Sequence, residues 1–236
     1  MKVDRSSENV GRMFDEIAPT YDFLNHFFSL GIDKLWRRRV VRILRRCGAR
    51  SILDVATGTG DLAIALAEGI PASAILGVDL SAQMLERAQN KILNCGLCER
   101  ISLEQCNVDN LVLKQESLDA VTVAFGIRNF ENREDALKKF IRLLKPGGHL
   151  VILEFSNPKN HILSKLYGFY SHRIMPLIGA AVSRNKKAYN YLPQSVDEFP
   201  EPKVFVQMLA GAGFEKISKR SQSLGIAHIY IAKKPS

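Results

Sequence analysis

Short apolar runs alternate with amphipathic stretches across residues 50–155. The apolar runs end at glycine or polar residues, as buried parallel strands do. The stretches between them place apolar side chains at helical spacing, and Ser81 stands where a cap would begin the longest one. The predicted strands are 51–56, 73–80, 100–107, 118–125 and 149–155, and the predicted helices are 61–69, 81–94 and 133–144. This order predicts an α/β fold with a mostly parallel sheet and helices on both of its faces.

The flanking segments follow other patterns. Residues 33–46 predict an amphipathic helix rich in arginine. Residues 202–212 predict a helix, and the two strands that follow it predict a hairpin at an antiparallel edge of the sheet. Residues 158–200 mix aromatic and basic side chains and interrupt the strand–helix rhythm, which indicates an inserted helical cap.

We therefore expect one domain over residues 1–236. It would comprise an N-terminal helical segment (1–48), a cofactor-binding core (50–155), the cap (158–200) and a C-terminal helix with its hairpin (202–236). In such a sheet, ligands bind beyond the carboxyl ends of the strands, at the point where the strand order reverses.

Composition narrows the class of protein. The chain has 236 residues, of which 46% are hydrophobic and 24% charged, so disordered and collagen-like structures are excluded. No apolar run reaches the length of a membrane span, and the first 16 residues do not form a secretory signal. Four cysteines without such a signal predict reduced thiols and a cytoplasmic protein.

The formal net charge of +9 suits a partner with phosphates or an anionic membrane surface. A solvated basic surface explains the same charge, and for residues 37–46 it is the simpler interpretation. No metal site is predicted, because Cys95 and Cys98 have neither a second pair nor a nearby histidine.

A glycine-rich segment, Asp54-Val-Ala-Thr-Gly-Thr-Gly-Asp61, joins the first predicted strand to a helix. Gly58 and Gly60 allow a ligand to approach the backbone. The third glycine of the dinucleotide fingerprint is missing, and Asp61 stands where a pyrophosphate would bind, which argues against NAD. A cationic or zwitterionic cofactor suits Asp54 and Asp61 better. The alternative is a plain glycine-rich turn between a strand and a helix, with no role in binding.

Two further motifs follow at the ends of the next strands. Asp79 lies 19 residues after Gly60, where a carboxylate can accept hydrogen bonds from ribose hydroxyls. A surface or helix-capping aspartate is the alternative. Cys106-Asn107-Val108-Asp109 ends the third strand and offers a polar group and backbone amides to an adenine edge.

In this order, the three motifs resemble those of class I S-adenosylmethionine-dependent methyltransferases over roughly residues 50–155. The resemblance implies a Rossmann-like, seven-stranded sheet with a final antiparallel hairpin, and S-adenosyl-L-methionine as cofactor. The cofactor-binding residues that it implies are Thr59, Asp79, Asn107, Val108 and, for close approach, Gly58.

Three other blocks are similar to signatures of the ubiquinone/menaquinone biosynthesis C-methyltransferases. They are Tyr21-Asp-Phe-Leu-Asn-His-Phe-Phe-Ser-Leu-Gly31 leading to Trp36, Phe125-Gly-Ile-Arg-Asn129, and Arg142-Leu-Leu-Lys-Pro-Gly-Gly-His-Leu-Val-Ile-Leu-Glu-Phe-Ser156. This resemblance runs from about residue 10 to the C-terminus. Ala124 departs from it, because some members place a cofactor-contacting serine there.

The narrower resemblance implies methyl transfer to a ring carbon of a polyprenylated quinol. The ring carbon becomes nucleophilic when the neighbouring hydroxyl loses its proton, at a cost of roughly 4 kcal/mol at neutral pH. We expect Arg128 to stabilise that phenolate, with water carrying the proton, and Asn129 and Tyr21 to orient the ring or the water. The alternatives are a structural ion pair for Arg128 and an ordinary helical core for the cap.

The expected acceptor is demethylmenaquinol, and the first alternative is a methoxy-benzoquinol of ubiquinone biosynthesis. The basic charge also motivates an RNA methyltransferase, although the apolar cap argues against nucleic acid as a partner. A non-catalytic cofactor-binding partner of a quinone-biosynthesis complex is a third reading. Contact with the inner face of the membrane would be peripheral.

Overall fold

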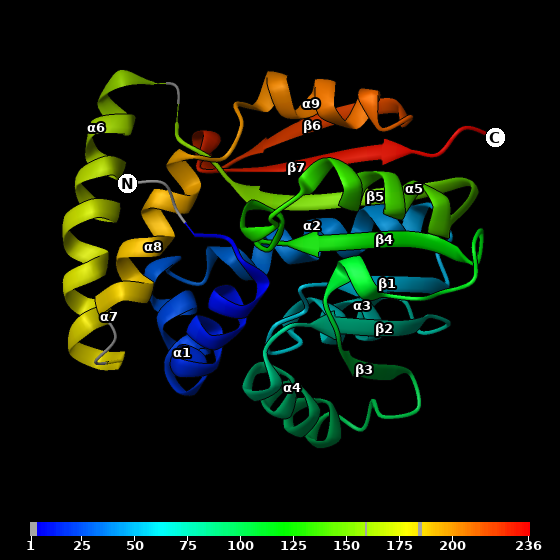
Figure 1. Cartoon of the computed structure of the whole chain (residues 1–236), viewed down its shortest axis with the longest axis horizontal. Helices are drawn as coiled ribbons and strands as arrows, with labels where there is room; N and C mark the ends of the chain where they lie inside the picture. Colours follow the sequence, from blue (N-terminus) through cyan, green and yellow to red (C-terminus); the bar gives the residue numbers. More distant parts are fainter. Residues whose placement is uncertain (1–3, 159, 184–185) are drawn as a thin grey trace.

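The computed structural model describes residues 4–158, 160–183 and 186–236, which form a seven-stranded sheet of order β3-β2-β1-β4-β5-β7-β6 (Figure 1). The strands are β1 (Ser51–Val55), β2 (Ala74–Asp79), β3 (Ile101–Gln105), β4 (Leu118–Ala124), β5 (Leu144–Phe155), β6 (Glu215–Gln222) and β7 (Ala227–Lys233). The first five are parallel, and β7 runs antiparallel to β5 and β6. The predicted fold class, including the antiparallel C-terminal hairpin, is confirmed.

Helices cover both faces of the sheet because each face presents apolar side chains. On one face, α2 (Ile32–Arg46), α3 (Asp61–Gly69) and α4 (Ala82–Asn94) bury a core that includes Trp36, Leu66 and Ile92. On the other, α5 (Arg133–Leu143) and α9 (Pro202–Gly211) bury a second core around Phe140 and Phe205. The Ser81 hydroxyl accepts from the Met84 amide at 3.1 Å, as its predicted capping role requires.

A further layer of helices lies beyond the carboxyl ends of the parallel strands, at the left of Figure 1. It contains α1 (Ser7–Phe28), α6 (His161–Phe169), the π-helical turn η3 (Tyr170–Ile174), α7 (Met175–Ser183) and α8 (Lys186–Asp197). Ile17, Leu24 and Ala188 form a small core in this layer together with Met84 of α4. The helical layer therefore covers the edge of the sheet where ligands are expected.

Two elements differ from the sequence prediction. α1 falls within the predicted N-terminal helical segment (1–48), but no bounds were predicted for it, because polar residues, aromatic residues and Pro19 obscure its amphipathic pattern. β5 begins at Leu144, five residues before the predicted start, and carries Pro146, Gly147 and Gly148 within the strand. Its pairing with β4 is irregular there, which accommodates the proline.

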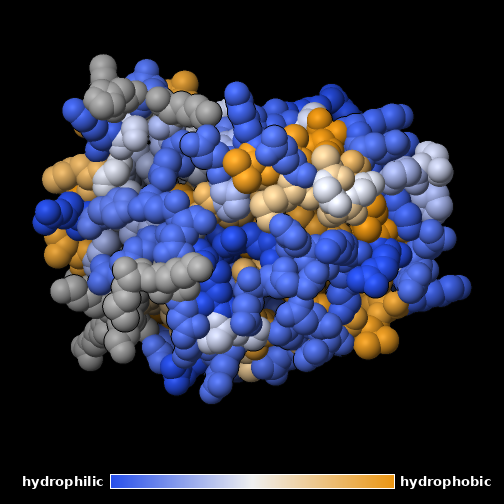
Figure 2. All heavy atoms as spheres, turned by 45° about the horizontal axis from the view of Figure 1, so that its top comes forward, coloured by the Kyte–Doolittle hydropathy of each residue, from blue (hydrophilic) through white to orange (hydrophobic). Residues whose placement is uncertain are grey.

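Within the described residues, no helix is both long and apolar enough to cross a bilayer. Hydrophilic side chains dominate the face shown in Figure 2, and the hydrophobic side chains on it form separate groups.

Candidate active site

The carboxyl ends of β1, β2 and β4 are level, because Val55 is in register with both Val78 and Val123. A cavity of about 830 Å³ lies at these ends, and we call it the Asp79 cavity. Its lining includes six of the predicted site residues: Tyr21, Gly58, Asp79, Asn107, Val108 and Asn129. Residues of α1 also line it, so this helix forms one wall of the cavity.

Asp79 fixes the shape of the glycine-rich loop. Its carboxylate accepts from the backbone amide of Gly58 at 2.8 Å and from that of Ser81 at 3.0 Å. Burial raises the pKa of Asp79 above its ordinary value, and the amide hydrogen bonds oppose that shift. Gly58 has a φ of +57°, and no atom lies within 4 Å of the position where a Cβ would stand. The loop thus leaves open space beside an acceptor carboxylate, which fits a nucleoside with free ribose hydroxyls.

The second polar group of the cavity, Asn107, is held from two sides. Its side-chain oxygen accepts from the Asp109 amide at 3.0 Å, and its nitrogen donates to the Ser7 hydroxyl at 2.8 Å. The neighbouring Val108 and Phe130 provide apolar lining for a flat ring. Ala124 lines the cavity with only a methyl group, so no polar side-chain contact is available there.

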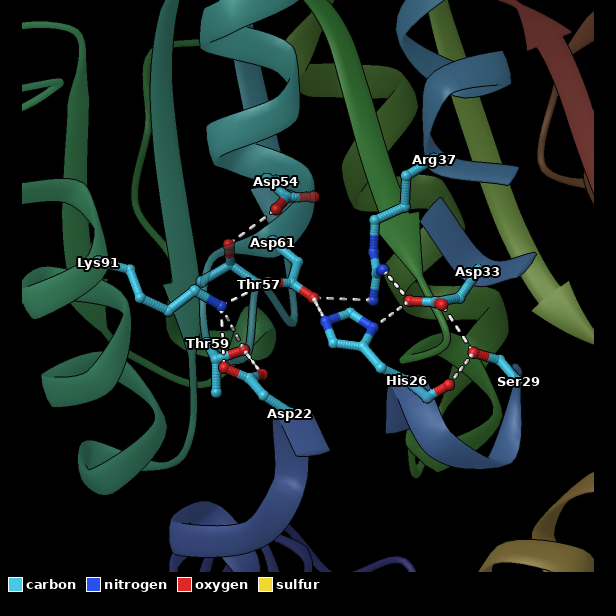
Figure 3. A network of polar contacts seen from close by, with 10 residues as sticks. All are labelled: Asp22, His26, Ser29, Asp33, Arg37, Asp54, Thr57, Thr59, Asp61 and Lys91. Carbon is cyan, nitrogen blue, oxygen red and sulfur yellow. Dashed lines mark hydrogen bonds and ion pairs between the residues drawn. The ribbon is translucent and has the colours of Figure 1, made fainter. Parts of the chain in front are cut away.

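Thr59 is the predicted cofactor residue that does not line the Asp79 cavity. Its hydroxyl is buried, donates to Asp22 of α1 and accepts from the Lys91 amine at 3.3 Å (Figure 3). Thr59 therefore connects the glycine-rich loop to α1 and α4. Sequence reasoning assigned no role to Asp22 or Lys91, because their elements meet only in the folded chain.

Asp61 belongs to a charge network that joins four helices, and we call it the Arg37 network (Asp22, His26, Asp33, Arg37, Asp61 and Lys91). Arg37 bonds Asp33 through Nη1 and reaches Asp61 through Nη2 at 3.2 Å. Lys91 pairs with both Asp61 and Asp22. His26 Nδ1 lies 2.9 Å from Asp33, and these contacts link α1, α2, α3 and α4.

The sequence suggested a cationic or zwitterionic cofactor beside Asp54 and Asp61, but other residues of the chain contact both carboxylates. Asp61 faces Lys91 and Arg37, whose charges compensate its own. Asp54 is buried, accepts from the hydroxyls of Thr57 and Thr122, and burial raises its pKa to about 6. Neither carboxylate lines the Asp79 cavity.

Arg128 occupies a second cavity, which adjoins the first. It lies on the short helix η2 (Ile127–Asn129), and a cavity of about 500 Å³, the Arg128 cavity, is lined by Arg128, Tyr21, Asn25 and Tyr191 among others. Tyr21, Phe14 and Phe125 line both cavities. The two spaces therefore meet at these aromatic side chains.

The guanidinium of Arg128 is buried and firmly held. Its Nη1 donates to Glu154 at 2.8 Å and to the carbonyl of Phe125, and its Nε donates to Ser195 at 3.2 Å. Glu154 is fully buried and also accepts from the Arg128 amide at 3.2 Å. Arg128 is thus part of a buried ion pair, yet within the described chain no group accepts from its Nη2.

The other two predicted acceptor-site residues lie beside Arg128. Burial raises the pKa of the Tyr21 phenol, although the positive charge of Arg128 opposes that shift, so the phenol is a neutral donor at pH 7. The Asn129 side-chain oxygen accepts from the Tyr191 hydroxyl at 3.1 Å. Asn129 lines the Asp79 cavity rather than the Arg128 cavity.

Sequence reasoning assigned no role to Glu154, Tyr191 or Ser195. The sequence pattern did indicate Glu154, because a single carboxylate in the otherwise apolar stretch 150–155 needs a buried partner. It did not indicate Tyr191 or Ser195, since α8 meets η2 only through the tertiary fold.

A third cavity, of about 1170 Å³, continues from the Arg128 cavity beneath the cap helices, and we call it the Trp36 cavity. The two share Asn25, Phe28, Phe155 and Leu192. Apolar and aromatic side chains such as Trp36, Tyr167 and Met175 supply much of its lining. The three cavities form a row, with Arg128 in the middle.

Comparisons with known proteins agree with this geometry. The model of the ubiE/COQ5 methyltransferase family matches residues 2–234. The ubiquinone/menaquinone biosynthesis C-methyltransferase UbiE of Syntrophotalea carbinolica is 45% identical over 96% of this chain and 94% of its own. The demethylmenaquinone methyltransferase of Bacteroides fragilis is 40% identical over 98% of this chain and 94% of its own.

A solved structure shares the fold at much lower identity. It is phosphoethanolamine N-methyltransferase 2 of Haemonchus contortus in complex with S-adenosyl-L-methionine, at 16% identity and a TM-score of 0.59 over 83% of this chain and 52% of that one. Family, fold and the lining of the Asp79 cavity agree. The chain therefore belongs to the ubiE/COQ5 methyltransferase family and is an S-adenosylmethionine-dependent methyltransferase.

Proposed function

We propose that the chain methylates a ring carbon of a polyprenylated quinol, with demethylmenaquinol as the first substrate to test. The observation that carries this proposal is the row of three cavities. A cavity with a ribose-type carboxylate and the Asn107 amide is followed by a small cavity with a buried arginine and then by a large apolar cavity. Cofactor, ring and isoprenoid tail have these three chemistries in the same order.

The Asp79 cavity is the proposed cofactor site. Asp79 would accept from ribose hydroxyls, Asn107 and Val108 would flank the adenine, and Gly58 would allow close approach. Thr59 would position the glycine-rich loop without its hydroxyl contacting the cofactor, because that hydroxyl donates to Asp22. When bound, S-adenosyl-L-methionine supplies an electrophilic methyl group on a sulfonium.

The Arg128 cavity is the proposed ring site. A phenol with an ordinary pKa near 10 must be deprotonated at a cost of roughly 4 kcal/mol at neutral pH. The Nη2 group of Arg128 would donate to the phenolate, and the Glu154 pair would hold that donor in place. A guanidinium does not act as a base at neutral pH, so the proton of the quinol would leave through water. Tyr21, at the junction of the two cavities, would orient the ring, and Asn129 would set the position of Tyr191.

The Trp36 cavity would take the first units of the isoprenoid tail. Its aromatic and aliphatic lining offers little to a nucleic acid, which would need basic and aromatic side chains along one track. A polyprenylated acceptor resides in a membrane, so we propose a cytoplasmic protein that contacts the inner membrane face peripherally.

A benzoquinol of ubiquinone biosynthesis is the second candidate acceptor. Relatives with 40–45% identity carry names from both pathways, which supports either ring. The linings of the Arg128 and Trp36 cavities do not distinguish a naphthoquinol from a benzoquinol.

The decisive experiment measures methyl transfer from labelled S-adenosyl-L-methionine to a short-tailed demethylmenaquinone analogue, with and without dithionite. Label should enter the organic phase only under reduction, because a quinone has no hydroxyl to deprotonate. A benzoquinol analogue run in parallel tests the second candidate. If cofactor binds but neither quinol is labelled, the proposed function fails, and tRNA is the next acceptor to test.

A further inference from the structure

One face of α2 changes from apolar to basic along its length. Ile32, Leu35, Arg39, Arg42 and Arg46 follow one another at intervals of three and four residues, so they lie on one side of the helix, and we call them the α2 stripe. Ile32 and Leu35 are 36% and 50% exposed, and the three arginines are exposed. At 1.5 Å per residue, Arg39 lies roughly 10 Å from Ile32 along the helix axis.

The apolar end of the stripe borders the Trp36 cavity. Ile32 and Leu30 line that cavity, and Leu30 is 82% exposed. The tip of the β6–β7 hairpin, η4 (Ser223–Gly225), is adjacent, because the Trp36 indole nitrogen donates to the Ser223 hydroxyl at 3.1 Å.

Leu224 at this tip is unusual in two respects. It is 82% exposed, and its φ of +59° lies in the left-handed region that disfavours residues with a side chain such as leucine. Its neighbours Ser223 and Ile226 line the Trp36 cavity. Exposed leucines therefore stand on two sides of the opening of an apolar cavity.

The basic end of the stripe forms a groove with β6. Arg39, Arg42, Arg46 and Arg220 line it together with Gln222, which accepts from Arg39; we call it the arginine groove. In the described part of the chain, none of these four arginines forms an ion pair. The groove therefore presents unneutralised positive charge next to the apolar opening.

We propose that the α2 stripe, the arginine groove and Leu224 form a docking surface for an anionic phospholipid bilayer, with the Trp36 cavity opening toward the lipid. Amphipathic helices of peripheral proteins bury apolar side chains by roughly 5–10 Å at a membrane surface while their basic side chains contact anionic headgroups, and the α2 stripe offers both kinds of side chain on one side of one helix. Leu30, Leu35 and Leu224 enter the acyl boundary while the arginines bind headgroup phosphates. The tail of the acceptor then passes from the bilayer into the cavity without crossing water. The docking surface specifies the peripheral membrane contact of the proposed function, and the passage of the tail rests on that function.

The test is sedimentation of the full chain with vesicles of phosphatidylcholine, alone or mixed with phosphatidylglycerol, at low and high salt. We expect binding to the mixed vesicles to be at least about tenfold tighter and to weaken with salt. Arg42→Glu with Arg46→Glu should lose at least about tenfold of that affinity. The matched control, Arg87→Glu with Lys114→Glu, makes the same change in charge on exposed residues outside the α2 stripe and the arginine groove and should retain that affinity.

A second pair of variants tests insertion. Leu35→Ser with Leu224→Ser should weaken binding to both vesicle types while leaving the salt dependence intact, and thermal melting would verify that both double variants fold. Equal losses in the matched control, no preference for anionic lipid, or an arginine groove that binds tRNA in place of vesicles would each overturn the proposal. Because these assays contain no acceptor, their outcome is separate from methyl transfer to the short-tailed analogue, which Arg42→Glu with Arg46→Glu should leave unchanged.

Discussion

Arg37 and Arg128 are both buried arginines that bond carboxylates, but their surroundings differ. In the Arg37 network, both terminal nitrogens of Arg37 are committed, one to Asp33 and one to Asp61. In the Arg128–Glu154 pair, Nη1 and Nε have partners, whereas no described residue accepts from Nη2. The first arginine joins helices, and the second has a donor left at the edge of a cavity. A buried ion pair therefore does not by itself separate a structural cation from a functional one, and we base the proposed role of Arg128 on its uncommitted donor.

The largest expected effect on turnover comes from replacing both members of the Arg128–Glu154 pair, which tests whether Arg128 differs in role from Arg37. In Arg128→Gln with Glu154→Gln, no buried charge is left unpaired, so the fold should persist. Turnover should fall by about a hundredfold to a thousandfold, because a fixed donor to the phenolate is lost. Single-turnover methyl transfer measures this effect.

Asp79→Ala is the contrasting variant. It should lose most of its affinity for the cofactor, which calorimetry with S-adenosyl-L-homocysteine measures. The variant Arg128→Gln with Glu154→Gln should bind the same ligand as tightly as the parent does. Equal losses of cofactor affinity in the two variants would contradict the division between the two cavities.

Replacing Arg37, whose two terminal nitrogens both bond carboxylates, should lower stability and leave turnover unchanged. Arg37→Met leaves Asp33 and Asp61 without their shared cation, so unfolding free energy should fall by about 3 to 5 kcal/mol. Turnover per folded molecule should stay near the parent value. Urea unfolding measures the free energy of unfolding, and an active-site titration gives the turnover per folded molecule. A loss of turnover without a loss of stability would mean that Arg37 acts in catalysis and not in joining the helices.

Asp54 should make stability depend on pH in a direction opposite to most carboxylates. Its folded pKa of about 6 lies above the ordinary value of 3.8, so the folded state binds the proton more tightly. This contribution is fully present below pH 3.8 and is lost as pH rises through about 6, for a total of about 3 kcal/mol.

The Asp54→Asn variant isolates that effect. Urea unfolding of the parent and the variant at several pH values from 4 to 7 should give a difference that grows in favour of the variant as pH rises. A difference that is independent of pH would show that Asp54 is ionised throughout.

The smallest expected effect is at the exposed end of the Arg37 network. Asp22 and Lys91 side chains are 35% and 31% exposed, so water screens their attraction. Asp22→Asn should cost less than about 1 kcal/mol in unfolding free energy. A cost as large as that of Arg37→Met would mean that the network acts as one unit.

Local patterns explain which parts of the molecule could be predicted. The sheet, its order of elements and the positions of Gly58, Asp79 and Asn107 follow from strand ends, which the sequence marks with glycine and polar residues. The direction of the Thr59 hydroxyl could not be predicted, because it depends on a hydrogen bond to Asp22. Asp22 lies on α1, whose bounds are hard to recognise in the sequence because the helix contains Pro19.

The charges of Asp54 and Asp61 show the same limit. Both flank the glycine-rich loop in sequence, yet one faces Thr122 and the other Lys91, and these partners come from elsewhere in the chain. A motif places a carboxylate near a site, whereas the tertiary partners decide which way it faces.

The contacts of α1 also set an order for folding during synthesis. Although α1 is made first, its hydrogen bonds reach far ahead in the chain: Asp15 to Ser81, Asp22 to Lys91 and Ser7 to Asn107. The helix has no partner for these groups until the first three strands have left the ribosome, so its docking is a late, long-range step. Because α1 is a wall of the Asp79 cavity, a nascent chain completes this proposed cofactor site only after that step, and cofactor binding there would report that the N-terminal helix has docked.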